Sequence, residues 1–251
     1  MSIAEKLTTI AENEQRVYKA GKQKEWSNFW DDLQKNGTRT DYSSAFYGAW
    51  TEKTFKPKYP IRAKDSAAQM LYSLQISDFE QHCLDNNIVI DVSQTTSVDS
   101  MLYSSITGTI PESLLDISNA SSAQRYVSEC RELIEVGIIQ SSFVTNFNRF
   151  FYNCTKLTTI GGIDVSKATN VSNMFSNCYA LTEISFSGTI PISISFSSSP
   201  LSLVSTKNVI NHLKDYSGTT TTYTLTLHAD SKAELGESDI AIATQKGWTL
   251  A

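Results

Sequence analysis

The sequence is poor in the residues and motifs that most often carry catalysis or hold metals. Its 251 residues include four cysteines and only three histidines, none in a recognisable catalytic context: His82, His212 and His228. It contains no G-x-S-x-G, P-loop or H-E-x-x-H motif and no C-x-x-C pair of the kind that zinc sites use. We therefore predict that the chain is not an enzyme and that it holds no metal and no cofactor.

Long apolar runs are also missing. No stretch approaches the ~18–20 apolar residues that a membrane-spanning helix needs. The opening residues, MSIAEKLTTIAENEQ, lack the basic start and the apolar core of a secretory signal. We expect no membrane insertion, and we expect any export to use another route, such as release of phage particles by lysis.

Basic residues become scarce after residue 64. Residues 65–251 contain 9 Lys and Arg against 18 Asp and Glu, a net charge of -9, whereas residues 1–64 contain 12 against 8, a net charge of +4. The split predicts two parts with different surfaces. The acidic part argues against nucleic-acid binding, because that affinity comes mainly from neutralising phosphate charge. Because 40% of the chain is hydrophobic, a packed core is feasible.

A 24-residue repeat is the strongest positive signal. The lines SSAQRYVSECRELIEV (121–136), TNFNRFFYNCTKLTTI (145–160) and TNVSNMFSNCYALTEI (169–184) align with six of sixteen columns apolar or Cys in all three copies. Such columns indicate repeats that bury one face against their neighbours. The predicted repeat core consists of Cys130, Leu133, Val136, Phe147, Phe150, Phe151, Cys154, Leu157, Ile160, Val171, Met174, Phe175, Cys178, Leu181 and Ile184.

Two weaker copies precede the clear ones, at 66–74 and 97–105, with a short helix and a strand expected between them. LTTI and LTEI alternate apolar and polar residues, so they are predicted to be the strands of two repeats. The segments NRFFYNC and SNMFSNC are expected to form the irregular or helical back of each repeat.

The cysteine column also carries a prediction. Cys130, Cys154 and Cys178 recur once per repeat and should stack. Neighbours could come within disulfide range, but three in a column cannot all pair. Free cysteine is among the most buried residue types, so we predict a reduced, buried column.

The line VSNMFSNCYALTEISF (171–186) resembles the repeat of bacterial BspA-type leucine-rich-repeat proteins, roughly N-M-F-x-N-C-x-x-L-x-x-I. The resemblance covers about residues 66–190 and departs upstream, where Ser105 stands in the cysteine column. The 24-residue spacing also falls in the ~20–29 range of leucine-rich repeats. The resemblance implies a cell-surface or secreted adhesion or interaction protein, and similar domains occur beside virion-type proteins in prophages of gut bacteria.

Together these observations predict an α/β fold built as a right-handed leucine-rich-repeat solenoid over residues 65–205, with the clear repeats at 121–190. Residues 1–64 are expected to be helical and aromatic-rich, and to act either as a cap or as a docking segment that forms a homo-oligomer. Residues 206–251 are expected to form a mixed α/β cap over the open end of the repeats.

The leading functional hypothesis is a non-enzymatic binding or adhesion module with a protein or glycan ligand. Its candidate binding residues face solvent on the predicted strands: Thr158, Thr159, Thr182 and Glu183. The alternative is a phage or prophage virion-type structural or receptor-binding protein with an oligomerising N-terminus. Either hypothesis implies a cell-surface, extracellular or virion-associated location.

Overall fold

The computed structural model describes residues 41–46, 48, 55–57, 60–74 and 76–251. Most of the predicted helical, aromatic-rich segment, residues 1–64, lies outside these residues. No helix of the described part is long and apolar enough to cross a membrane.

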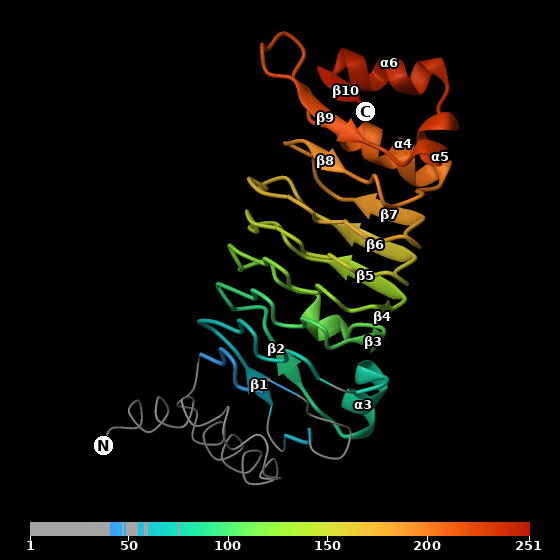
Figure 1. The fold of residues 1–251 in the computed structure, drawn as a ribbon. Coiled ribbons are helices and arrows are strands. Elements are labelled where there is room, and N and C mark those ends of the chain that lie inside the picture. Colours follow the sequence, from blue (N-terminus) through green and yellow to red (C-terminus); the bar gives the residue numbers. More distant parts are fainter. Residues whose placement is uncertain (1–40, 47, 49–54, 58–59, 75) are drawn as a thin grey trace.

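Short parallel strands dominate the described part, and successive segments lie one above the next from β1 to β9 (Figure 1). They form four sheets of two or three strands, and every strand pairing in them is parallel. The strands are β1 (Ile61–Arg62), β2 (Ile90–Asp91), β3 (Thr107–Gly108), β4 (Glu132–Leu133), β5 (Glu135–Ile139), β6 (Thr159–Ile163), β7 (Glu183–Phe186), β8 (Ile194–Ser195), β9 (Tyr223–Thr226) and β10 (Trp248–Leu250).

The register of the central sheet follows the 24-residue repeat. Ile160 of β6 pairs with Val136 of β5 on one side and with Ile184 of β7 on the other. These three residues are buried, because alternate strand residues point inward. The register then shifts between Ile160 and Ile163, where β6 bulges against β7.

The backs of the repeats are chains of turns rather than helices. Two residues four positions apart take a positive φ in each repeat, for example Arg149 at 55° and Asn153 at 61°. Left-handed residues cannot continue an α-helix. Backbone amides here bond to the next repeat instead, as when the Phe151 amide donates to the Met174 carbonyl at 2.9 Å.

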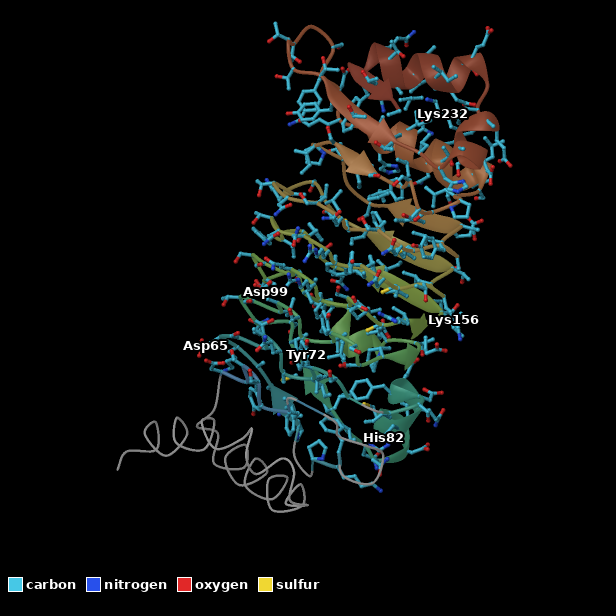
Figure 2. All side chains as sticks on the ribbon, viewed as in Figure 1. Asp65, Tyr72, His82, Asp99, Lys156 and Lys232 are labelled. Atoms are coloured by element: carbon cyan, nitrogen blue, oxygen red, sulfur yellow. The ribbon has the colours of Figure 1, made fainter. Side chains whose placement is uncertain are left out.

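The predicted repeat core is buried throughout, and none of its fifteen residues is more than 8% exposed. Aromatic rings stack from one repeat to the next inside it. The Phe151 and Phe175 ring centroids lie 5.8 Å apart, and the Phe175 and Phe196 centroids lie 4.7 Å apart. The sulfur atoms are visible inside the same stack (Figure 2).

An insertion interrupts the earlier repeats. Helix α3 (Phe79–Asp85) begins at Asp78, whose side chain accepts a hydrogen bond from the Gln81 amide, and β2 follows it. A short 3₁₀ turn, η2 (Glu112–Leu114), projects between β3 and β4. The predicted helix and strand between the weak repeats are therefore present, and η2 was not expected.

The C-terminal end is covered by α4 (Leu203–His212), α5 (Ala229–Ala233) and α6 (Glu237–Gln245), together with β8, β9 and β10 (Figure 1). Helix α4 closes the free edge of β7 with side chains. Ser205 Oγ accepts from the Ile184 amide at 3.0 Å, and Asn208 Oδ1 accepts from the Phe186 amide at 3.1 Å. An exposed strand edge invites further pairing, so these two bonds end the central sheet.

The predicted fold class, an α/β right-handed leucine-rich-repeat solenoid, is wrong. The described residues form mainly small parallel sheets with few helices, and no solenoid is found in them. A leucine-rich repeat combines a strand with a helix or 3₁₀ turn in each copy. Here the paired left-handed residues turn the back of each regular repeat, and the sheets stay separate instead of running along all repeats.

Candidate functional site

Two of the four predicted binding residues use their hydroxyls inside the protein. Thr158 Oγ1 donates to the Ile134 carbonyl at 3.0 Å, and Thr182 Oγ1 donates to the Thr158 carbonyl at 3.5 Å. Both bonds join one repeat to the repeat before it. These threonines therefore stabilise the stacking of repeats, and their hydroxyls are less available to a ligand.

The other two, Thr159 and Glu183, are direct partners on β6 and β7. Glu183 accepts a hydrogen bond from Ser205 Oγ of α4 at 2.9 Å, so its carboxylate helps to hold the C-terminal helix. Thr159 is half-buried and lines a groove on the outer face of the strands. Of the four predicted residues, Thr159 alone lines this groove.

We call this hollow the sheet-face groove; its volume is about 580 Å³. Strands β5 and β6 form one side, and residues near α3 and η2 form the other. Its lining is aliphatic and acidic: Glu80, Thr109, Ile110, Glu112, Leu115, Glu135, Val136, Gly137, Ile138, Gln140 and Thr159. Its three carboxylates carry the negative charge that prevails after residue 64.

Two glycines of β6, Gly161 and Gly162, leave the strands without side chains beside this groove. A Cβ atom on Gly161 would lie 3.2 Å from the Gly137 carbonyl carbon, tighter than an ordinary contact. A Cβ on Gly162 would lie 3.5 Å from Ile138 Cγ2. Because these positions carry no side chains, they do not cover Ile138, whose side chain is 66% exposed at the groove.

A second hollow, the α3 groove, lies between α3 and η2 and has a volume of about 420 Å³. Two exposed aliphatic side chains line it, Leu84 at 66% and Val89 at 48%. Glu80 and Glu112 line both the α3 groove and the sheet-face groove. The two hollows therefore share an acidic wall.

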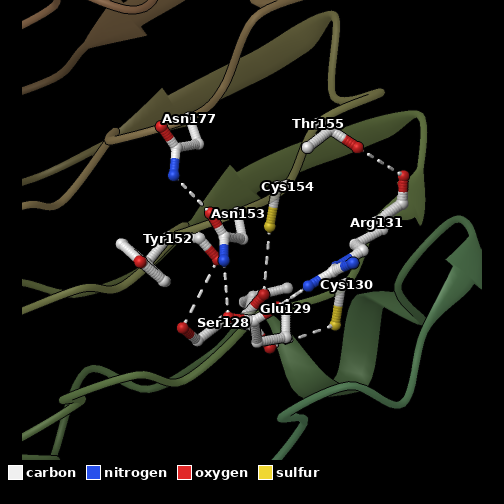
Figure 3. Close-up of polar contacts among 10 residues, drawn as sticks. Ser128, Glu129, Cys130, Arg131, Tyr152, Asn153, Cys154, Thr155 and Asn177 are labelled. Atoms are coloured by element: carbon white, nitrogen blue, oxygen red, sulfur yellow. Dashed lines mark hydrogen bonds and ion pairs between the residues drawn. The ribbon is translucent and has the colours of Figure 1, made fainter.

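A column of polar side chains runs along one corner of the repeats (Figure 3). Tyr179 donates to Asn177 Oδ1 at 2.7 Å, and Asn177 Nδ2 donates to Asn153 Oδ1 at 2.5 Å. Asn153 Nδ2 in turn donates to Glu129 Oε1 at 2.6 Å, and Arg131 Nη2 donates to Glu129 Oε2 at 2.9 Å. Each member thus finds its partner within the column.

A corner groove of about 710 Å³ shares Glu129 and Arg131 with this column, and Tyr103 and Glu132 also line it. Its charges are already paired, since Arg131 bonds to Glu129 and Lys156 bonds to Glu132 at 2.5 Å. Lys156 lies at the outer edge of the strands (Figure 2). A ligand here would have to compete with these internal pairs, so this groove is the weaker candidate.

The cysteines are free and buried. Burial raises the pKa of the Cys130 thiol to about 11 and that of the Cys178 thiol to about 12, and it raises the pKa of Cys154 well above its ordinary value. The Cys154 Sγ donates to the Val127 carbonyl at 3.1 Å. A nucleophilic cysteine needs a lowered pKa, so these thiols are structural.

The histidine rings are engaged with nearby groups. His82 Nε2 lies 2.7 Å from the Phe55 carbonyl, and His212 Nδ1 lies 2.8 Å from the Asn208 carbonyl. His228 accepts from the Asp230 amide at 3.3 Å and caps α5. Within the described residues, no group of three or more His, Cys, Asp or Glu is arranged to hold a metal ion.

Sequence reasoning missed Glu80, Glu112 and Ile138 as groove residues. The insertion that carries Glu80 was visible as a break in the repeat, and the pair Gly161–Gly162 was visible as a place without side chains. Neither signal could show that α3, η2 and β5 line one hollow, because they are distant in the chain.

Comparisons with known proteins return nothing: the chain matches no protein-family model, no curated protein and no solved structure. The resemblance to BspA-type repeats therefore stays a prediction.

Proposed function

We propose that the protein is a non-enzymatic binding module that recognises a protein ligand through the outer face of β5 and β6. The observation that carries this proposal is the sheet-face groove, an open hollow with an exposed aliphatic side chain and three carboxylates. Grooves that combine apolar contact area with a few polar groups are typical of recognition sites. No aromatic ring lines this groove, which favours a protein over a glycan as the ligand.

The chemistry of the described side chains supports binding rather than catalysis. The thiols stay protonated because burial raises their pKa, and the histidine rings bond to backbone groups close by. General acid–base catalysis needs a titratable group free to reach a substrate. The predicted virion-type role depends on an oligomerising N-terminus; residues 1–40 lie outside the described residues, and that role stays a prediction.

The test is a binding assay with the immobilised full chain against extracellular proteins and a glycan array. Thr159→Arg places a long side chain in the sheet-face groove, and Thr182→Arg is the matched control because Thr182 is exposed but does not line the groove. We expect Thr159→Arg to weaken binding at least about tenfold, as loss of a central contact does, and Thr182→Arg to change it little.

Equal binding by the two variants would place the ligand elsewhere on the molecule. A ligand found only on the glycan array would contradict the protein-ligand proposal. Failure of every protein and glycan to bind would contradict the function as a whole.

A further inference from the structure

We infer that the sheet-face groove and the α3 groove form one docking surface for a peptide segment in which a basic side chain is flanked by aliphatic ones. This inference rests on the proposed function and names the chemistry of its ligand. It draws on three features of the described residues: exposed aliphatic side chains in both grooves, a shared acidic wall, and linings without a basic residue.

The exposed aliphatic side chains lie on both sides of the acidic wall. Leu84 and Val89 line the α3 groove, and Ile138 lines the sheet-face groove. They are 66%, 48% and 66% exposed. Single exposed apolar residues need no explanation, but here three of them line two adjoining hollows, where a partner could cover them together.

The wall between the hollows consists of Glu80 from α3 and Glu112 from η2. The Glu80 carboxylate accepts a hydrogen bond from Thr109 Oγ1 at 2.5 Å, which orients it toward the β3 side of the groove. Glu135 of β5 adds a third carboxylate at the sheet-face groove. A ligand that crosses the wall therefore meets negative charge between two apolar areas.

The occupant follows from charge complementarity. Among the described residues that line these two grooves, none is Lys, Arg or His. A basic side chain is the group that three nearby carboxylates attract, and Arg or Lys can also lay its apolar stem along aliphatic surface. The order of features across the surface is aliphatic, acidic, aliphatic, so the matching segment is aliphatic, basic, aliphatic.

The experiment is selection of a displayed library of random nonapeptides on the immobilised full chain, followed by sequencing. Three synthetic nonapeptides then serve as probes, each with two leucines on both sides of a central arginine, glutamine or glutamate. Their affinities are measured by fluorescence anisotropy for the native chain, for Glu80→Gln and Glu112→Gln together, for Ile138→Ser, and for Glu237→Gln. The last variant is the control, because Glu237 is exposed in the first turn of α6, at the far end of the molecule.

We expect the enriched peptides to carry a basic residue between aliphatic ones, and the arginine probe to bind best. The paired glutamine substitutions should weaken it about fivefold to tenfold, since two partly exposed charge pairs are lost. Ile138→Ser should weaken it about tenfold, the effect of losing one covered aliphatic side chain. Higher salt should weaken the arginine probe and leave the glutamine probe unchanged.

Enriched peptides without basic residues, equal affinities for the three probes, or no enrichment at all would overturn the inference. The function proposed above has its own test in the Thr159→Arg variant. If that variant loses a protein ligand while basic peptides bind no better than acidic ones, then the groove binds a partner of other chemistry and only this inference fails.

Discussion

The regular region, residues 121–190, and the irregular region, residues 61–120, share a backbone geometry but differ in the spacing of equivalent residues. Both contain pairs of left-handed residues, such as Ser100 and Ser104 at φ 54° in the irregular region and Asn173 and Asn177 at 56° and 63° in the regular one. In the regular region, equivalent residues recur every 24 positions. In the irregular region Ala67 and Val98 occupy equivalent places 31 positions apart, and the seven extra residues equal the length of α3.

The difference shows where a stacked chain can form recognition surfaces. In the strict repeats, polar side chains bond to their copies in the neighbouring repeat, as Asn177 does to Asn153. Residues of the irregular region, among them Glu80 of α3 and Glu112 of η2, line the sheet-face groove together with β5. The buried columns therefore account for the stability of the stack, whereas the proposed binding surface depends on the departure from the repeat. Each prediction below tests one side of this comparison.

The largest expected effect is loss of a core column residue in either region. Phe151 and Leu102 occupy the same column, and both are fully buried. We expect Phe151→Ala to lower the free energy of unfolding by about 3–5 kcal/mol and Leu102→Ala by about 2–5 kcal/mol, through lost transfer energy and the cavity left behind. Urea denaturation measures both.

Thr159→Ala is the control for these truncations, because Thr159 faces the groove and should cost less than about 0.5 kcal/mol. A small effect of Leu102→Ala beside a large one of Phe151→Ala would show that the irregular region is not part of the same cooperative core. The comparison of the two regions would then have to treat them as separate folding units.

The periodicity of the sequence was enough to predict the core columns, because a repeated apolar or Cys position has no other common cause than burial. It also located strands near LTTI and LTEI, although β6 and β7 start two residues later than predicted. It could not settle the backs of the repeats. Asn153 and Asn177 are ordinary left-handed residues, but Arg125, Glu129 and Arg149 take the same conformation without any such signal.

The prediction of the fold class was wrong because the sequence did not settle the conformation at the backs of the repeats. An apolar column at 24-residue spacing is equally compatible with a helical back and with a turned back. The candidate site was mostly missed for a different reason. All four predicted residues were chosen as solvent-facing strand positions, and three of them bond within the protein. Only the placement of α3, η2 and β5 around one hollow reveals the groove, and this placement depends on how the insertion folds back.

A second, smaller effect is expected just after β6 and β7, where Gly188 of one repeat lies against Asp164 of the repeat before it. A Cβ on Gly188 would clash with Asp164 Oδ1, and that oxygen accepts a hydrogen bond from the Ser166 amide at 2.8 Å. Gly188→Ala should therefore cost about 1–3 kcal/mol, as overpacking does. Thermal unfolding of the single variant and of the Asp164→Ala background gives the coupling.

The two substitutions should not add, because removing the Asp164 carboxylate removes the closest contacts and leaves the one with Ser166 Cβ at 3.1 Å. Gly218 provides the contrast: it has φ +80° with open space around it, so Gly218→Ala should cost about 1 kcal/mol in any background. If Gly188→Ala lowered the free energy of unfolding equally with and without the Asp164 carboxylate, close contact with that carboxylate would not explain why position 188 lacks a side chain.

The cysteine column can be tested by exchanging Cys and Ser between equivalent positions of the two regions. Cys154 stands in the regular region, and Ser105 occupies the corresponding column in the irregular region, where it donates to the Leu71 carbonyl and accepts from the Leu74 amide. Cys154→Ser should cost about 1–2 kcal/mol, because a polar hydroxyl enters an apolar site in which the Val127 carbonyl is the acceptor that the thiol uses. Ser105→Cys should cost about 1 kcal/mol through loss of its two bonds.

Thiol labelling checks the same column independently. The raised pKa and burial of Cys154 predict that a thiol reagent at pH 8 labels it only after denaturation. Rapid labelling of native Cys154, or a stabilising Cys154→Ser, would contradict a tightly packed column in the regular region.

The smallest effect is expected for an ion pair between neighbouring repeats. Lys156 Nζ lies 2.5 Å from Glu132 Oε2, but the two side chains are 59% and 56% exposed. Water and salt screen such a pair, so a double-mutant cycle of Lys156→Met and Glu132→Gln should give a coupling of about 0.5 kcal/mol or less, falling further in high salt. The bond joins two regular repeats, yet its loss should leave the stack intact, since buried columns and backbone bonds already fix the register. A coupling as large as that of a core contact would mean that charge at the corners, and not the repeated columns, holds the regular region together.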